Sequence, residues 1–430
     1  MYIIFGGFMK KLLTFVLSAI MLVSCLSFAA SADVATEEIA PLIRSRLDNY
    51  EGETDIYDFT SRYGWSVDET VNEIIASAYF TNPDLFYVSN KFNYTADTAG
   101  RVHTVGFSFT MTPSERKAAQ KKLDAAVDKV LAGITDDMND VDKALYVHDY
   151  LVLNCKYGVM SQHTSYDCLV GKKAVCQGYS LAYEYIMRDR LGIDCTVVFS
   201  RSQNHMWNYL RINGKWYHVD LTLDDPGTSY NGTTYDMWGL VLHKNFLMSD
   251  AQCMETSALH RGWTISGGYG AASDKTYDNA FWKNVRARIC MLDGQYYYIS
   301  DSGKDASSGQ RIMTLYRYDK STGKAKAALK IKSRWFSRRV NGNSAVAAYG
   351  TKVYTTGYMS LDTYGGKLYV NTNKTVYRFD PSTGKSKKIY TLNKGEEKQI
   401  FGLVTVGNYV RIAYKDDLTY AEKYISLKMK

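Results

Sequence analysis

Apolar residues spaced three or four positions apart predict four helices in the first half of the chain. The first follows the capping-box signature Ser66-x-x-Glu69, and the second starts at Thr112-Pro113. The third covers residues 141–153, and the fourth runs from 175 to 191. Each of the four carries one apolar face, which indicates that it packs against a core.

Strands are predicted both between these helices and after them. Residues 85–88 and 102–109 are rich in aromatic and β-branched side chains, as half-buried strands are. Beyond residue 281 the pattern changes to short Tyr- and Val-rich runs separated by turns. Helices and strands in this order indicate an α+β fold that is followed by an all-β region.

An internal repeat marks the all-β region. Residues 315–324 (LYRYDKSTGK) match residues 376–385 (VYRFDPSTGK) at an offset of 61 positions. Strand-turn-strand units of this kind resemble the repeats of β-propellers. The region holds about three or four units of the usual length. Because most propellers have more, its closure into a ring stays an open question.

These patterns divide the 430 residues into five expected parts. A chain with 46% hydrophobic and 22% charged residues is expected to pack into globular domains, which excludes a disordered protein. The expected parts are a signal peptide (1–32), an α/β region (33–112), a core (113–264), a linker (265–280) and an all-β repeat domain (281–430).

The first part has the pattern of a secretory signal peptide. Lys10 and Lys11 precede an apolar run, 12–26, and small residues follow up to Ala32. The run is too short to favour a permanent transmembrane segment, and no other segment reads as one. The stretch ending at Cys25 resembles a bacterial lipoprotein box, so lipidation there is the alternative to cleavage. We expect the protein to be secreted or associated with the cell envelope.

The net charge of +8 is the sum of two parts of opposite charge. Residues 281–430 carry 28 Lys and Arg against 11 Asp and Glu, a net charge of +17, which leaves −9 for residues 1–280. Scattered basic residues on strands are usually a solvated surface, and the alternative is a surface that binds an anionic cell-envelope polymer or glycan. Export and the lack of a recognition motif argue against a nucleic-acid partner.

Cysteine spacing argues against a structural metal. Six cysteines follow Cys25, and an exported protein permits disulfides among them, although the pairing stays open. No Cys-x-x-Cys or His/Cys spacing appears, so we expect no zinc site and no other cofactor. Cys155 and Cys168 are expected to be structural.

Cys176 is the cysteine in a reactive setting. It stands at the expected first turn of the fourth helix, after Lys172 and Lys173. Unpaired backbone N–H groups and the helix dipole favour a thiolate at that place, and the thiolate is the form that attacks carbonyl carbon.

A predicted hairpin supplies a base and an acid. Asn213-Gly214 signals a two-residue type I′ turn, so paired positions on the two strands sum to 427. His205 and Asp220 then share one face as diagonal neighbours, which is the relation of a base to its orienting acid. His218 shares that face, so geometry alone leaves it as a rival base.

These residues resemble the bacterial transglutaminase-like superfamily. The resemblance rests on Cys-Gln-Gly-Tyr at 176–179, His-x-Trp-Asn at 205–208 and Gly-Lys-Trp-Tyr-His-Val-Asp-x-Thr-x-Asp-Asp-Pro at 214–226. It extends back through His148-Asp-Tyr-Leu151 to about residue 143, with weaker echoes at 82–87 and 246–260. It implies a papain-like core. Met206 and Leu223 depart from the family pattern, where Ala and Trp are common.

Carried over by position, the resemblance implies a catalytic triad of Cys176 as nucleophile, His205 as base and Asp220 as orienting acid. It therefore favours His205 over His218. The backbone N–H of Cys176 is a natural oxyanion donor, and Tyr157 or Gln177 are candidates for a second one. Trp207, like Trp216, is a candidate lining of a substrate groove, with simple packing as the alternative.

The expected function is thiol-dependent acyl transfer on protein or peptide amides. If water resolves the thioester, the protein is a cysteine peptidase or amidase; if an amine resolves it, the protein is a crosslinking transglutaminase. The third possibility is a cell-surface adhesion protein that keeps the papain-like core only as a scaffold. The sequence favours hydrolysis slightly, because no pocket for an acceptor lysine can be argued.

Overall fold

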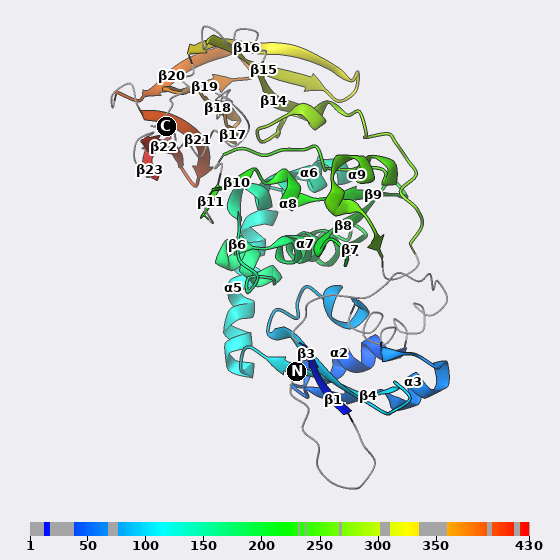
Figure 1. Ribbon diagram of the computed structural model, residues 1–430. Coiled ribbons are helices and arrows are strands. Elements are labelled where there is room, and N and C mark those ends of the chain that lie inside the picture. The colour runs from blue at the N-terminus through cyan, green and yellow to red at the C-terminus, as the bar shows by residue number, and fades with distance from the viewer. Residues whose placement is uncertain are drawn as a thin grey trace. The chain divides into compact units, whose positions relative to one another are not determined.

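The computed structural model contains both helices and antiparallel sheets, which confirms the α+β fold (Figure 1). The structure describes these residues: 13–17, 38–67, 76–230, 233–236, 239–265, 269–301, 310–334, 359–393, 398–416 and 422–429. Within them, no helix has the length and apolar character needed to cross a membrane.

The chain forms two compact units, and each is built from separate segments. The first unit comprises Met1–Lys129, Met160–Val219 and Ser249–Asp274. The second comprises Val130–Val159, Asp220–Met248 and Lys275–Lys430. The chain therefore passes between units within the stretch predicted as one core, 113–264.

The first unit opens with a four-stranded antiparallel sheet in the order β1-β3-β4-β2. Its strands are β1 (Leu13–Leu17), β2 (Glu53–Asp55), β3 (Val88–Ala96) and β4 (Val102–Phe109). β4 has the predicted bounds. The strand predicted at 85–88 is misplaced, because residues 85–87 are not in a strand and β3 starts only at Val88. Leu85, Phe86 and Tyr87 are buried, so their apolar run reflects core packing. β1 comes from the predicted signal segment, whose other residues lie outside the described ones.

Helices α2 (Ala40–Asp48) and α3 (Tyr57–Tyr63) accompany this sheet. The helix predicted from Ser66 falls largely outside the described residues, which resume with a π-helical turn, η2 (Ala76–Phe80). The second predicted helix is present as α5 (Pro113–Leu131). Its start carries a reciprocal cap, in which Thr112 N–H donates to Glu115 Oε2 (2.8 Å) and Glu115 N–H donates to Thr112 Oγ1 (3.3 Å).

A second sheet of the first unit has the order β12-β7-β8-β9. Its strands are β7 (Cys195–Ser200), β8 (His205–Ile212), β9 (Lys215–Val219) and β12 (Trp263–Thr264). The β8–β9 hairpin has the predicted register, since Asn208 pairs with Val219 and Ile212 with Lys215. Asn213 (φ 51°) and Gly214 (φ 77°) are both left-handed, as a type I′ turn requires.

The fourth predicted helix is divided into two parts. It begins as α7 (Cys176–Glu184), continues as the π-helical η4 (Tyr185–Arg190), and turns away at Gly192 with φ 68°. Ahead of it lie a π-helical turn, η3 (Asp167–Gly171), and a short strand, β6 (Lys173–Ala174). Helix α9 (Asp250–Thr256) and the 3-10 turn η5 (Ala258–His260) complete the described helices of this unit.

Residues 265–280, predicted as a linker, are partly packed against the first unit where the structure describes them. Tyr209 Oη donates to the carbonyl of Gly270 (2.7 Å), and the N–H of Asp250 donates to the carbonyl of Ala272 (2.9 Å). Ala272 is only 1% exposed. Residues up to Asp274 therefore belong to the first unit, and the chain enters the second unit only at Lys275.

The second unit starts with the third predicted helix, α6 (Asp140–Asn154). Asn139 caps it in a capping box with Asp142. Short elements follow: β5 (Lys156–Tyr157), α8 (Leu221–Asp224), β10 (Gly227–Tyr230), β11 (Thr233–Asp236) and η6 (Phe281–Asn284).

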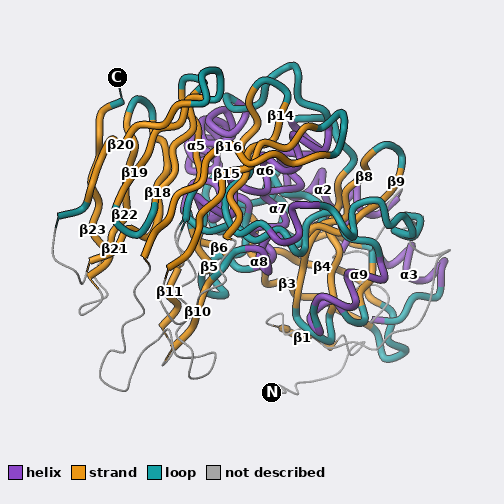
Figure 2. Tube along the Cα trace, turned by 90° about the horizontal axis from the view of Figure 1, so that it is seen from above, coloured by secondary structure: helices purple, strands orange, loops and turns teal. Residues whose placement is uncertain are grey.

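The rest of this unit consists of three antiparallel sheets (Figure 2). They have the orders β13-β14-β15-β16, β17-β18-β19-β20 and β21-β22-β23. The strands are β13 (Cys290–Leu292), β14 (Gln295–Asp301), β15 (Gln310–Asp319), β16 (Lys324–Arg334), β17 (Leu361–Tyr364), β18 (Lys367–Asn371), β19 (Thr375–Asp380), β20 (Lys385–Thr391), β21 (Lys398–Val406), β22 (Tyr409–Asp416) and β23 (Glu422–Lys428). This is the predicted all-β region, divided into separate sheets.

The sequence repeat corresponds to two equivalent hairpins, β15–β16 and β19–β20. In their turns, Asp319 and Asp380 accept backbone N–H bonds from Ser321 (2.9 Å) and Ser382 (3.1 Å). Gly323 and Gly384 close the turns with φ 67° and 66°. Ladder irregularities fall between Leu315 and Tyr316 and between Val376 and Tyr377. The two β-bulges are therefore 61 positions apart, as the repeats are.

Candidate active site

Cys176 is the first residue of α7 and is partly exposed. Val175 before it has extended backbone and gives the helix no side-chain cap. The first turn therefore has no capping side chain for its N–H groups, and Cys176 stands at the positive end of the helix dipole. This is the setting predicted for Cys176.

The fold requires glycine two residues after Cys176. A Cβ atom at Gly178 would lie 2.7 Å from Cβ of Ala174 and 2.9 Å from the carbonyl oxygen of Thr164. Both distances are shorter than real carbon contacts allow. Gly178 thus lets α7 start tightly against residues 164 and 174.

Gln177 presents an unused donor beside Cys176. Its Nε2 atom is buried and has no hydrogen-bond partner among the described residues. A buried amide nitrogen without a partner costs on the order of 1–3 kcal/mol, and such groups are rare in folded proteins. Gln177 therefore has the chemistry predicted for an oxyanion donor.

His205 is the first residue of β8 and is 8% exposed. Its neighbour Met206 belongs to a small apolar cluster with Leu181, Val197 and Phe199, and Cys176 packs against the same cluster. The departure from the family pattern at Met206 is thus a core contact. It links the strand that begins at His205 to the helix that begins at Cys176.

Two side chains flank the ring of His205. Trp207 lies nearly parallel to it at 5.6 Å between centroids, and the ring of His260 lies at 6.0 Å. His205 and His260 offer ring nitrogens within 4.8 Å of each other. His260 is fully buried, with Nδ1 at 2.8 Å from the carbonyl of Cys253. His260 was not predicted as a site residue from the sequence, although it is the last residue of the weak family resemblance at 246–260.

Trp207 and His218 form a buried chain with Asp250. The indole Nε1 of Trp207 donates to Nδ1 of His218 (2.9 Å), and Nε2 of His218 lies 2.8 Å from Asp250 Oδ1. Burial lowers the pKa of His218, although the Asp250 hydrogen bond opposes it. Trp207 is fully buried and its N–H is used, so it is a packing residue; the predicted substrate-groove role does not fit it.

Asp220 directly follows β9 and caps the next helix. It is 1% exposed, and its Oδ1 accepts the N–H groups of Thr222 (2.9 Å) and Leu223 (3.1 Å) at the start of α8. The hydroxyl of Thr222 also donates to Oδ1 (2.7 Å). These donors hold the carboxylate in one orientation.

The remaining predicted residues are placed as follows. Tyr157 is on β5 with its side chain 46% exposed, so it is not a core residue. Trp216 is half-buried and stacks on Tyr209 at 5.0 Å. All six cysteines after Cys25 are unbridged, and every one of them except Cys176 is buried.

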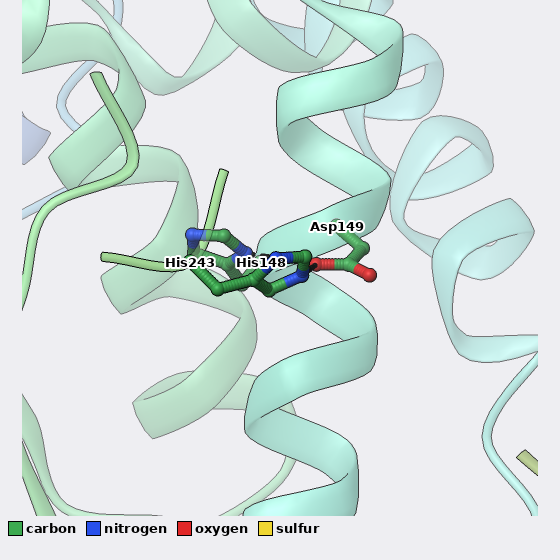
Figure 3. A group of neighbouring side chains, drawn as sticks. All are labelled: His148, Asp149 and His243. Atoms are coloured by element: carbon green, nitrogen blue, oxygen red, sulfur yellow. Dashed lines mark hydrogen bonds and ion pairs between the residues drawn. The ribbon is translucent and has the colours of Figure 1, made fainter. Parts of the chain in front are cut away.

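A second polar cluster, in the second unit, was missed from the sequence. His148 and Asp149 on α6 lie beside His243 (Figure 3). A ring nitrogen of each histidine and a carboxylate oxygen of Asp149 all lie within 4.8 Å of one another. All three are fully buried. The donor set suits a divalent metal, yet each of the three side chains is already engaged in hydrogen bonds. Asp224, which belongs to the family-like motif at 214–226, bonds to His148 in the same cluster.

Comparison with known families gives one result. The model of the transglutaminase-like superfamily matches residues 125–221, a segment that contains Cys176, His205 and Asp220. A comparison with curated proteins finds no match. Residues 125–221 are therefore similar to the core of the transglutaminase-like superfamily, within an α+β chain that ends in separate antiparallel sheets.

Proposed function

We propose that the protein is an exported thiol-dependent acyl-transfer enzyme that cleaves amide bonds of proteins or peptides. The observation that carries this proposal is Cys176 at the uncapped start of α7, packed against the cluster that contains the neighbour of His205. A helix N-terminus stabilises a thiolate, and a thiolate is the attacking form in amide chemistry.

The reaction has two steps. His205 takes the proton of the Cys176 thiol, and the sulfur attacks the amide carbon to form a tetrahedral oxyanion. The oxyanion collapses, the C–N bond breaks, and His205 returns the proton to the leaving amine. Water, deprotonated by His205, then attacks the thioester and releases the acid and the thiol.

Asp220 is the proposed orienting acid for His205. Its carboxylate is fixed by the start of α8, and continuing the hairpin register by one pair sets it opposite Trp207. His218 is the weaker candidate base because both of its nitrogens are committed to Trp207 and Asp250.

Gln177 is the proposed second oxyanion donor, beside the backbone N–H of Cys176. An unpartnered buried amide costs free energy in the resting protein, and a developing oxyanion would supply its missing acceptor. Tyr157 is the alternative donor, since its exposed side chain has no role in the core.

The same thioester permits transamidation when an amine replaces water. The deciding experiment incubates the protein with a peptide library and a fluorescent primary amine, and reads cleavage and amine incorporation separately. Cys176→Ala should abolish both products, whereas Cys155→Ala, which removes a buried thiol, should keep them. Products that persist in Cys176→Ala would overturn the proposal, and no product from the native protein would favour the scaffold alternative.

We also propose that the basic C-terminal sheets hold the enzyme to an anionic envelope polymer or glycan. Seven exposed lysines lie on the outer strands of the repeated hairpins, β16 and β20. They are Lys324, Lys326, Lys330, Lys332, Lys385, Lys387 and Lys388. Lysines on edge strands also prevent sheet-to-sheet association, so binding has to be measured directly.

A further inference from the structure

The buried polar cluster of the second unit lies between three segments of that unit. His148 and Asp149 come from α6, and His243 lies in the loop after β11. Figure 3 shows these three side chains. Asp224 ends α8. All four side chains have no exposed surface. Placing two imidazoles and two carboxylates away from water is costly unless each is paired and hydrogen-bonded.

Every side chain of the cluster is paired. Asp149 Oδ1 lies 2.9 Å from both His148 Nδ1 and His243 Nε2, and Asp149 Oδ2 accepts the N–H of Ile289 (2.9 Å). His148 Nε2 lies 3.3 Å from Asp224 Oδ2. His243 Nδ1 lies 3.0 Å from the carbonyl oxygen of Val285.

This pairing determines the charges. Both nitrogens of His148 face carboxylates, so both act as donors and the ring is an imidazolium. Burial lowers the pKa of His148, but the hydrogen bonds to Asp149 and Asp224 outweigh it and raise that pKa to about 9. His243 faces an acceptor at each nitrogen as well. The ring of Phe246 covers His148 at 5.1 Å. A further buried ion pair in this unit joins Arg288 to Asp362, and the charge of Arg288 also acts on Asp149.

The cluster holds the turn that carries Asp220. Asp224 Oδ1 accepts the side-chain amide of Asn245 (2.9 Å), and its carboxylate also accepts the backbone N–H of Asn245. The carbonyl of Asn245 in turn accepts the N–H of Asp220 (3.0 Å). His148, Asp224, Asn245 and Asp220 thus form a continuous chain of hydrogen bonds.

The cluster also holds the segment that leads into the C-terminal sheets. Val285 and Ile289 each give one backbone group to it, and β13 begins at Cys290. The same buried charges therefore fix two segments: the turn after β9 and the entry to the β-sheets.

We propose that His148 and Asp149 are positioning residues that set the orientation of Asp220 through Asp224 and Asn245. This inference rests on the proposed function of Asp220. Loss of the imidazolium leaves Asp224 a buried carboxylate without its cation, so the α8 turn rearranges to reach water or takes up a proton. Either change moves the carboxylate that the triad uses.

The test compares His148→Gln and Asp149→Asn with Asp362→Asn in the full chain. Asp362 is the matched control because it is a buried, ion-paired carboxylate of the same unit whose hydrogen bonds go to Arg288, Thr363 and Thr405 instead of to the α8 turn. Asp220→Asn is the reference for a lost orienting acid, since its amide oxygen still accepts the cap bonds of α8. The readouts are the melting temperature, the rate of Cys176 alkylation by iodoacetamide against pH, and hydrogen exchange of residues 220–226.

We expect His148→Gln and Asp149→Asn to shift the alkylation profile toward that of Asp220→Asn and to speed exchange at 220–226 by about tenfold or more. Asp362→Asn should lower the melting temperature while leaving the profile native. If folded His148→Gln keeps native exchange and a native profile while Asp220→Asn changes the profile, the positioning role is wrong. If neither Asp220→Asn nor His205→Ala changes the profile, the proposed function itself fails.

The last measurement is the content of divalent metal ions in the purified native protein and in His148→Gln. A stoichiometric divalent ion in the purified chain that is lost in His148→Gln would overturn the ion-pair network, because His148 would then be a neutral ligand. A chain without such an ion supports the network.

Discussion

The indole Nε1 of Trp207 donates a hydrogen bond to Nδ1 of His218 at 2.9 Å. The bond fixes the tautomer of His218, whose Nε2–H is then directed at Asp250. A histidine with an acceptor and a donor already bonded in a buried site has no lone pair left for a thiol proton.

His218→Gln should therefore lower the stability of the protein but have little effect on the reactivity of the Cys176 thiol. We expect the loss of about 1–3 kcal/mol that follows from leaving buried partners unpaired. The alkylation rate of Cys176 should stay within about twofold of native, whereas His205→Ala should lower it by about tenfold or more. A larger effect on alkylation from His218→Gln than from His205→Ala would reverse the assignment of the base.

Gln177→Ala should lower turnover without lowering stability. The Nε2 atom of Gln177 has no hydrogen-bond partner among the described residues, so the variant removes no bond of that nitrogen and relieves the cost of burying it unpaired. We expect kcat on a cleaved peptide to fall by about 10- to 100-fold with KM within about twofold. Tyr157→Phe is the comparison, and a larger loss there would transfer the donor role to Tyr157.

Gly178→Ala should distort the start of α7. Its Cβ would overlap Ala174 and the carbonyl of Thr164, and such overpacking costs about 1–3 kcal/mol. Gly270→Ala is a matched control, because a Cβ there meets nothing within 4 Å. Thermal unfolding should separate the two variants, and slower Cys176 alkylation should accompany Gly178→Ala alone.

Stability should fall with rising pH between about 7 and 9. The pKa of His148 is raised from 6.5 to about 9, so its contribution is complete below 6.5 and is lost as pH rises through 9. A shift of this size corresponds to on the order of 3 kcal/mol. Urea unfolding at several pH values measures it, and His148→Gln should flatten the decline.

At low pH, stability should change in the opposite direction and fall as the pH falls. Burial raises the pKa of Asp149, but His243 and His148 outweigh it and hold that pKa below its usual range. Its contribution is present above pH 3.8 and is lost as pH falls through the lowered value. Asp149→Asn should therefore be less sensitive to acid than the native chain, and an unchanged acid transition would argue against this ion pair.

Charge reversal on β20 should release the protein from an anionic polymer. The triple variant Lys385→Glu, Lys387→Glu and Lys388→Glu changes exposed residues on the outer strand of its sheet. Retention on isolated anionic cell wall should fall several-fold and should also fall with added salt. The same reversal at Lys117, Lys121 and Lys122 on α5 is the control, and equal losses from both would point to net charge alone.

Much of the architecture could be predicted from local patterns. Asn213-Gly214 determined the register of the β8–β9 hairpin because two left-handed residues permit only one tight turn. The strand predicted at 85–88 was misplaced because an apolar run looks the same in a buried turn and in a strand. The break of the fourth helix into α7 and η4 carried no proline or glycine signal.

The buried polar cluster around His148 could not be predicted from the sequence for a different reason. His148 and His243 lie 95 positions apart in the sequence, and nothing in local spacing brings them together. In the sequence, His148-Asp149 and Asp224 belong to separate motifs of the family resemblance, which give no sign of a common role. Their common role emerges only when α6, α8 and the loop after β11 meet in one unit.

The shared bulge of the β15–β16 and β19–β20 hairpins has a consequence for their shape. Ala328 and Ile389 are the residues left unpaired in the two ladders, and they too are 61 positions apart. A bulge bends its strand and increases the local right-handed twist. The two hairpins therefore bend at equivalent positions, so the repeat in sequence is also a repeat in strand curvature.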